Sequence, residues 1–419
     1  MNDGSHVSSY IGSGQEPRWS IVVIGLISLV ALGLLAPIGL QPEKYQWDFR
    51  VYYYAASAYQ AGINPYDVQA VHQFAPSCPG FTFVYPPLLL KFFGLFTLLP
   101  YESAYLVWFV IKLLALVGLL FLWRRYLFPG ESLFPYALVV LMGFSSTIYM
   151  DMVTGNTSLI EQVLLWTGLI FWLRERLTAF VVFVLLASIF KLLPIAFLLL
   201  LLITPRRGNW KLLLAGLGGF SLVQGVSYVL APELFGRFLV AARGINERGA
   251  DSNPSLLSMV RDLTDAVVPP GAAGTGFWIA VAVYAAMAVI IVAVSIRAWR
   301  ILRASPEKDA VSSSLYLACA TYGLLVPRFK VYSLILLLPA ACYVLKRSTR
   351  LPAWPFLLAL LAMTIYPPLP KLLPVHFVEQ YIWLYYPLFL AFLVWGLLLR
   401  LILTRPLGQQ REVAAAVIQ

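Results

Sequence analysis

The chain has 419 residues, of which 60% are hydrophobic and 12% charged, and its 30 lysines and arginines outnumber 19 aspartates and glutamates. Soluble domains carry roughly 25% charged residues, so the composition excludes an ordinary soluble or disordered protein. The positive charges lie mostly in short clusters between apolar blocks. The positive-inside rule explains that placement without a nucleic-acid partner.

The apolar blocks are roughly 15–25 residues long, which is the length that crosses a bilayer as a helix. We therefore predict an all-α polytopic membrane protein with about 12 transmembrane helices. Ten of them are expected at residues 19–40, 101–124, 133–150, 156–173, 210–230, 276–297, 311–326, 331–345, 352–368 and 381–403.

Two apolar segments do not fit a simple span. Residues 84–99 are short and contain Pro86, Pro87 and Lys91, which favours an interfacial or re-entrant helix. Residues 178–203 are preceded by basic residues at 174 and 176 and followed by others at 206 and 207, with Lys191 and Pro194 in the middle. Two half-spans that turn near Lys191 would keep both basic ends on one side of the membrane.

The basic clusters then all face the cytoplasm. This arrangement predicts one transmembrane domain, residues 19–403, between cytoplasmic tails at 1–18 and 404–419. Two long outer segments are expected, an aromatic one at about 41–83 and a polar loop at about 231–274. We expect the protein in the cytoplasmic (inner) membrane, with its site facing outward.

The first outer segment opens on a carboxylate, Asp48, which follows the first span. It could cap a helix or pair with Arg50, and it could also be a general base at the membrane interface. The tyrosines that follow, Tyr52 and Tyr53 among them, could form an aromatic belt or stack on sugar rings. Asp67, after Gly62, has the position of a turn residue.

Ionisable residues also occur where a membrane protein usually avoids them. Glu161 lies inside a predicted span. An ionisable residue there could be functional, or it could form one half of an internal ion pair. Lys191 could bind a phosphate or snorkel to the interface. Arg328 and Lys330 oppose the positive-inside trend, which either a phosphate-bearing ligand or anionic head groups would explain. No histidine or cysteine spacing indicates a metal, so no cofactor is implied.

Several motifs in order resemble one known family. They are WDFRVYYYAASAYQAGINPYD, VYPPLLLKFFGLFTLLP, the TGN turn, FKLLP (190–194), NPSL and PRFKVYSLILLLP. Together they resemble glycosyltransferase family 87, the polyprenol-phosphate-mannose-dependent mannosyltransferases, over most of residues 19–345. The resemblance implies the GT-C membrane fold. It also implies transfer of mannose, mainly in α-1,2 linkages, as in the phosphatidylinositol-mannoside mannosyltransferases.

The resemblance also implies roles for individual residues. Asp48 becomes the catalytic carboxylate, and Lys191, Arg328 and Lys330 lie near the donor phosphate. Further candidates for binding the sugar or the acceptor are Tyr52, Tyr53, Tyr85, Asn156, Glu161 and Asn253. Polyprenyl phosphate leaves without protonation, so one base that activates the acceptor hydroxyl suffices, and attack from the opposite face inverts the configuration.

The expected partners are therefore a polyprenyl-phosphate sugar donor, a glycolipid or glycan acceptor and membrane lipids, with no nucleic acid and no obligate protein partner. Two alternatives remain open from the residues alone: a transporter or flippase of a lipid-linked substrate, and a GT-C enzyme that uses another lipid-linked sugar. The sequence has no repeat between its halves, which weakens the transporter reading. In an enzyme, Asp48, Lys191, Arg328 and Lys330 should converge on one site.

Overall fold

The computed structural model describes residues 18–130, 133–203, 209–269, 273–305, 309–347 and 376–404. Every regular element within these ranges is a helix. The helices are α1 (Arg18–Leu40), α2 (Trp47–Gln60), α3 (Val68–Phe74), α4 (Pro87–Phe93), η1 (Phe96–Leu98), α5 (Tyr101–Tyr126), α6 (Leu133–Thr154), α7 (Ser158–Leu173), α8 (Leu177–Phe190), η2 (Leu193–Leu202), α9 (Trp210–Leu230), α10 (Pro232–Arg243), η3 (Gly249–Asp251), α11 (Leu256–Val267), α12 (Ala273–Ala304), α13 (Ala310–Leu325), η5 (Val331–Leu337), α14 (Leu338–Arg347) and α17 (His376–Leu403).

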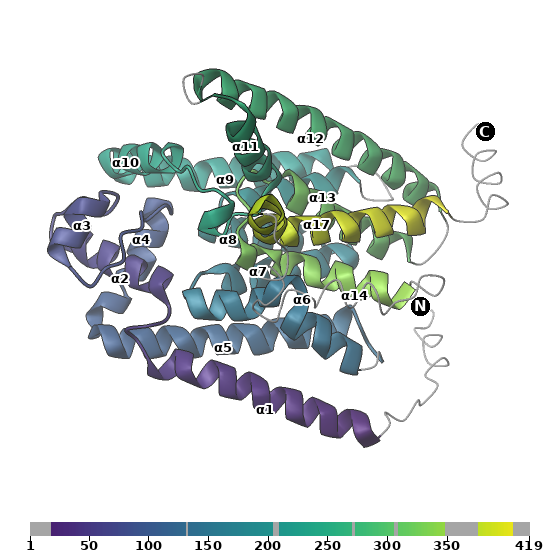
Figure 1. Cartoon of the computed structure of the whole chain (residues 1–419), viewed down its shortest axis with the longest axis horizontal. Coiled ribbons are helices and arrows are strands. Elements are labelled where there is room, and N and C mark those ends of the chain that lie inside the picture. The colour runs from purple at the N-terminus through teal and green to yellow at the C-terminus, as the bar shows by residue number, and fades with distance from the viewer. Residues whose placement is uncertain are drawn as a thin grey trace.

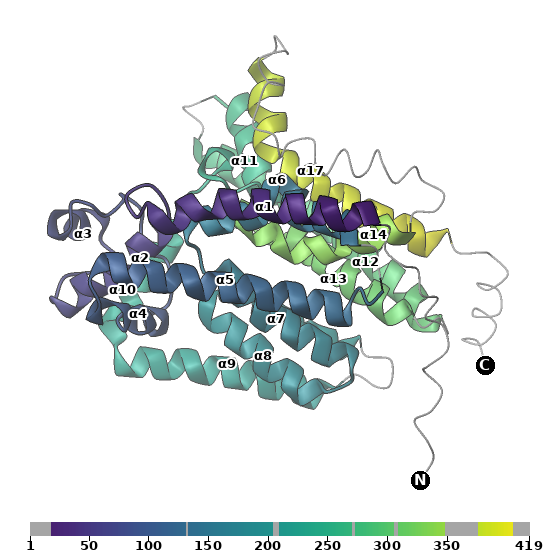
Figure 2. The ribbon, with the colours of Figure 1, turned by 90° about the horizontal axis from the view of Figure 1, so that it is seen from below.

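The long helices form a bundle in which α5, α7, α8 and α9 lie side by side (Figure 2). Among the described residues, four helices are long and apolar enough to cross a membrane: Tyr101–Tyr126, Trp210–Leu230, Gly274–Ala304 and Leu384–Leu403. The pair Tyr136–Phe144 and Ser146–Thr154, bent by 55°, would make a fifth. Shorter apolar helices such as α7, α8 and α13 pack among them. The helical architecture is consistent with the polytopic membrane protein predicted from the sequence. The predicted number of 12 spans stays a prediction.

The break expected near Lys191 is present. Helix α8 ends at Phe190, Lys191 has an extended backbone, and η2 begins at Leu193. Pro194 lacks the N–H that an uninterrupted α-helix would need there, so the chain turns at this point. The two short helices α8 and η2 pack against each other.

Two expectations need correction. Helix α6 continues to Thr154, four residues beyond its expected end at residue 150, so Asp151 lies within the helix. The segment 231–274 is not a polar loop, because it contains α10 and α11. Both helices are amphipathic, and α10 buries only Leu234 and Phe238. Because the polar face of such a helix lowers its average hydropathy, the search for apolar blocks did not detect them. The expected span 352–368, the tail 1–18 apart from Arg18 and the tail 404–419 beyond Thr404 lie outside the described residues.

The first outer segment folds into a cap at one end of the bundle, built from α2, α3, α4 and η1 with α10 against it (Figure 1). The cap has its own aromatic core, in which Phe49 stacks on Trp108 with ring centroids 5.3 Å apart and Phe238 packs near Tyr66. Because Trp108 belongs to α5, this core fixes the start of α2 against the bundle.

Six basic residues in the last turns of helices gather at the opposite end. Helices α5, α12, α14 and α17 all finish there (Figure 1), and their last turns carry Arg124, Arg125, Arg303, Lys346, Arg347 and Arg400. We call this the basic end of the bundle. The cap and this basic end therefore lie at opposite ends of the molecule.

Candidate active site

The site forms where the start of α2 meets the turn between α6 and α7. The backbone N–H of Gln46 donates to the carbonyl of Val153 at 2.7 Å. Gly155 in the turn has a φ of +74°, and a Cβ there would lie 2.7 Å from the Cβ of Gln46. The indole N–H of Trp108 donates to the Gly155 carbonyl at 2.9 Å. Only glycine suits this backbone and this close approach, which together bring Asp48 to Asn156.

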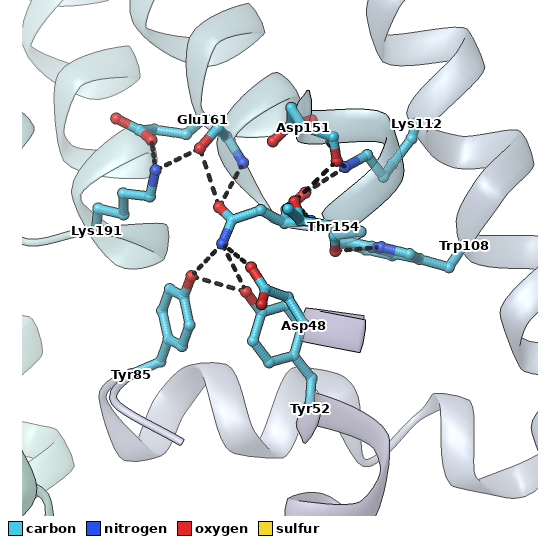
Figure 3. A network of polar contacts seen from close by, with 12 residues as sticks. Asp48, Tyr52, Tyr85, Trp108, Lys112, Asp151, Thr154, Glu161 and Lys191 are labelled. Carbon is cyan, nitrogen blue, oxygen red and sulfur yellow. Dashed lines mark hydrogen bonds and ion pairs between the residues drawn. The ribbon is translucent and has the colours of Figure 1, made fainter. Parts of the chain in front are cut away.

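Asn156 is the centre of a hydrogen-bond network that includes Asp48, Tyr52 and Tyr85, which are labelled in Figure 3. Its side-chain amide nitrogen lies 2.7 Å from Asp48 Oδ2, 3.0 Å from the Tyr52 hydroxyl and 3.1 Å from the Tyr85 hydroxyl. The two tyrosine hydroxyls are 2.8 Å apart. The amide oxygen of Asn156 accepts bonds from the Ser158 N–H and hydroxyl at 3.2 and 2.9 Å. These contacts on both sides fix the amide, so its N–H groups point at Asp48.

Asp48 is only partly exposed, and the surrounding protein raises the pKa of its carboxyl group by burial. The hydrogen bond from Asn156 and the charges of Lys330 and Lys112 offset part of this rise, since they favour the ionised form. Within the described residues, Oδ2 accepts the Asn156 bond and Oδ1 makes no hydrogen bond. The carboxylate therefore combines increased basicity with one available oxygen.

Asp48 does not have the structural roles that its position suggested. It is the second residue of α2, and the cap position belongs to Gln46. Arg50 is not its partner either, because the guanidinium bonds to the Tyr101 hydroxyl at 3.1 Å and to the Pro42 carbonyl. Asp67, by contrast, caps α3 by accepting bonds from two backbone N–H groups, as a turn residue would.

Two ion pairs lie beneath the network. Lys112 and Asp151 are completely buried and 2.7 Å apart, and Lys112 also donates to the Asn156 carbonyl at 2.7 Å. Lys191 lies 2.9 Å from Glu161 and donates to the Ser158 hydroxyl at 2.5 Å. Glu161 is thus one half of an internal ion pair, and Ser158 connects that pair to Asn156.

A second cluster holds the late basic motif. Glu247 accepts bonds from Arg328 at 2.5 and 3.0 Å and lies 2.8 Å from the Lys330 ammonium. Burial alone would raise the pKa of Glu247, but the hydrogen bonds and charges of Arg328 and Lys330 outweigh it and hold the pKa below its ordinary value. Asn253 accepts from the Phe329 N–H at 3.0 Å and donates to the Glu247 carbonyl. Asn253 therefore fixes the backbone beside the two cations.

The predicted residues fall into two groups and one exception. Asp48, Tyr52, Tyr85 and Asn156 meet in one network, and the charges of both Asp48 and Lys191 act on Tyr85. The group of Arg328, Lys330 and Asn253 is electrostatically connected to the first through Lys330 and Asp48. Tyr53 lies apart, since its hydroxyl donates to the Leu99 carbonyl within the cap.

Sequence reasoning missed Lys112, Ser158 and Glu247. A lysine inside a predicted span is a signal that could have identified Lys112. Ser158 and Glu247 gave no such signal, because their roles come from tertiary contacts. Among the residues that the structure describes, no group of three or more histidine, cysteine or acidic side chains could hold a metal ion.

Comparison with family models matched glycosyltransferase family 87 to residues 83–327, which is more than half of the chain. The matched segment contains Tyr85, Asn156, Glu161, Lys191 and Asn253, whereas Asp48, Arg328 and Lys330 lie outside it. Comparisons with curated proteins and with solved structures gave no match.

Proposed function

Since the chain belongs to glycosyltransferase family 87, we propose that it transfers a mannosyl unit from a polyprenyl-phosphate donor to a hydroxyl of a glycolipid or glycan acceptor. The family implies a membrane glycosyltransferase, and the apolar helices fit a membrane protein. The site would face the outer side of the cytoplasmic membrane. The observation that supports the proposal most is the environment of Asp48: a basic carboxylate with one open oxygen, among cations.

The first half of the proposed reaction concerns the acceptor. Asp48 Oδ1 takes the proton of the acceptor hydroxyl as its oxygen attacks the anomeric carbon of the donor sugar. Burial favours this step because it raises the pKa of Asp48 towards the range where a carboxylate is an effective base. Asn156 keeps the carboxylate in place through Oδ2 and stabilises its ionised form. The faces of Tyr52 and Tyr85 would bound the space for the sugar.

The second half concerns the leaving group. The bond between the anomeric carbon and the phosphate oxygen breaks, and polyprenyl phosphate leaves with the electron pair. Attack from the face opposite the leaving group inverts the anomeric configuration. Lys191, Arg328 and Lys330 would offset the charge of the departing phosphate. Glu161 and Glu247 hold these cations in place.

The distribution of charge also bears on the transporter alternative. A transporter would place its ionisable residues along a path at the middle of the bundle. In this chain Asp48 lies at the start of α2, and the charge of Lys330 in the second cluster acts on it. This convergence on one carboxylate favours an enzyme.

The proposal is tested with the purified protein in lipid nanodiscs that contain extracted membrane glycolipids. The protein should transfer radiolabelled mannose from polyprenyl-phosphate-mannose and not from a nucleotide-mannose. Polyprenyl-phosphate-glucose is the matched control for the sugar. Transfer of glucose alone would correct the sugar and retain the reaction class. Transport of labelled donor across liposomes with no transfer would overturn the proposal in favour of the transporter.

A further inference from the structure

A groove of about 640 Å³ lies on the side of the bundle between η2, α12 and α13, and its lining runs from Leu193 and Pro327, close in sequence to Lys191 and Arg328, to Arg300 and Arg303. Its wall is almost entirely apolar, with Ala196 and Phe197 on η2 and Tyr322 on α13. The ring of Phe197 packs on that of Tyr322 with centroids 4.7 Å apart. The groove opens on an apolar surface where Leu199 is 55% exposed, so membrane lipid would reach it directly.

The charged residues that line this groove are Arg300 and Arg303, both on α12. They are three positions apart, which puts them on neighbouring parts of one helix face. Both are exposed, and neither has an acidic partner within the part of the chain that the structure describes. Helix α12 finishes at the basic end of the bundle (Figure 1), so the groove is apolar along its length and cationic at that end.

The size of the groove limits its occupant. Along α12 it extends from Val292 to Arg303, and at 1.5 Å per residue this is roughly 16 Å. That length is about half of the roughly 30 Å hydrocarbon thickness of a bilayer. The groove therefore has the depth of one leaflet. A lipid with its head group at the arginines would extend one acyl chain to the bilayer centre.

We propose that the groove is a binding site for an anionic phospholipid of the leaflet at the basic end. Its phosphate binds Arg300 and Arg303, because the guanidinium fork matches phosphate oxygens. One acyl chain lies along Ala196, Phe197 and Tyr322. Basic pockets between membrane helices on the cytoplasmic side are typical sites for anionic lipid head groups. Trp299 lines the same end, held by its N–H bond to the Ser314 carbonyl at 3.2 Å.

The bound chain would support an element that is weak by itself. Helix η2 is a 3₁₀-helix of 10 residues, whereas such helices rarely exceed about four. A lipid packed on Leu199 and Ala196 covers the exposed side of this element. The site does not depend on the transferase reaction, so it can be tested separately from it.

The test uses the full chain in detergent and two photoactivatable probes that share their acyl chains, phosphatidylglycerol and phosphatidylcholine. Cross-linked peptides are mapped by mass spectrometry. We expect phosphatidylglycerol to label η2 and α13 at concentrations where phosphatidylcholine does not. The double variant Arg300→Gln/Arg303→Gln should weaken this labelling roughly 10- to 30-fold, as expected for the loss of two arginine contacts near a membrane surface.

Two variants provide the controls. Arg297→Gln removes the same charge from the same helix but does not line the groove, so labelling should be unchanged. Ala196→Trp fills the groove at an exposed position and should abolish labelling although both arginines remain. Equal labelling by the two probes, or labelling that survives the double variant, would overturn the proposal. Displacement of phosphatidylglycerol by polyprenyl phosphate, but not by excess unlabelled phosphatidylglycerol, would also overturn it and assign the groove to the donor chain.

Discussion

Asp48 and Asn156 form the pair on which the proposed chemistry depends. The side-chain amide of Asn156 donates to one carboxylate oxygen at 2.7 Å and accepts a bond from the Ser158 hydroxyl, while Lys112 bonds to the backbone carbonyl of Asn156. A positioned amide leaves the negative charge on Asp48, whereas a lysine or arginine in its place would lower the basicity of the carboxylate much further. The pair thus keeps Asp48 ionised, oriented and basic.

Replacing Asn156 tests this account at the level of one residue. Asn156→Ala removes a hydrogen bond that favours the ionised carboxylate, so the pKa of Asp48 should rise further. Activity should require ionised Asp48. The acidic limb of the kcat/KM profile should therefore move to higher pH, with a rate loss of roughly 10- to 100-fold at pH 7. A rate loss with an unchanged profile would show that Asn156 acts only on structure.

At the scale of elements, the α6–α7 turn decides whether α2 can approach the bundle. Gly155→Ala places a side chain on a backbone with φ of +74° and 2.9 Å from the Cα of Gln46. We expect a loss of roughly 2–4 kcal/mol in stability, from the left-handed backbone and the overlap together. Gly62→Ala is the matched control, because Gly62 has φ of +78° with nothing within 4 Å. That variant should lose only about 1–2 kcal/mol. Equal decreases in the apparent Tm would contradict the account of the turn.

The ion pairs of Glu247 with Arg328 and Lys330 connect the segment before η3 to the segment after α13. Glu247 has a pKa below its ordinary value, so its ionised form stabilises the fold above the unfolded pKa of about 4.3. This contribution disappears as the pH falls through the lower folded pKa. Glu247→Gln should therefore lower the apparent Tm at pH 7, and the difference from wild type should vanish at strongly acidic pH.

Glu233→Gln is the control for this experiment. Glu233 also pairs with an arginine, Arg237, but its side chain is 82% exposed. Exposed ion pairs contribute little to stability, so this variant should unfold like the wild type at every pH. A pH-independent difference for Glu247→Gln would show that its hydrogen bonds matter and its charge does not.

The sequence predicted the elements better than their contacts. Apolar blocks long enough to cross a bilayer gave the helices α1, α5 and α9 almost to the residue, and the conflict of basic clusters predicted the break at Lys191. Amphipathic helices such as α10 were missed, because hydropathy averages their two faces. Asp48 was identified as a candidate by position and resemblance, whereas Glu247 acquires its role only from a fold that brings it to Arg328.

At the scale of the whole molecule, the cap and the basic end lie at opposite ends of the bundle (Figure 1). The positive-inside rule then predicts that the cap, and the proposed site beneath it, lie outside the cytoplasm. Gly80 is exposed in the cap, and Thr178 is exposed near the start of α8, beside the basic residues Arg174 and Arg176. The three native cysteines, Cys78, Cys319 and Cys342, are buried.

A labelling experiment tests this orientation. A membrane-impermeant thiol reagent should label Gly80→Cys in intact cells and Thr178→Cys only after the cells are permeabilised. Wild-type protein, with its buried cysteines, gives the background. Labelling of both variants in intact cells, or of Thr178→Cys alone, would contradict the proposed outward-facing site.

We propose Asp48 as the base of a glycosyl transfer, and the most direct test of this role is the turnover of Asp48→Asn in the donor assay. The variant should lose roughly 10²- to 10⁴-fold in rate, the usual contribution of general base catalysis, while it still binds the donor. Asp67→Asn makes the same change at the N-cap residue of helix α3. This variant should keep the wild-type rate, because asparagine is also a favourable N-cap residue. If Asp48→Asn retains most of its turnover in membranes where the wild type is active, Asp48 is not the base.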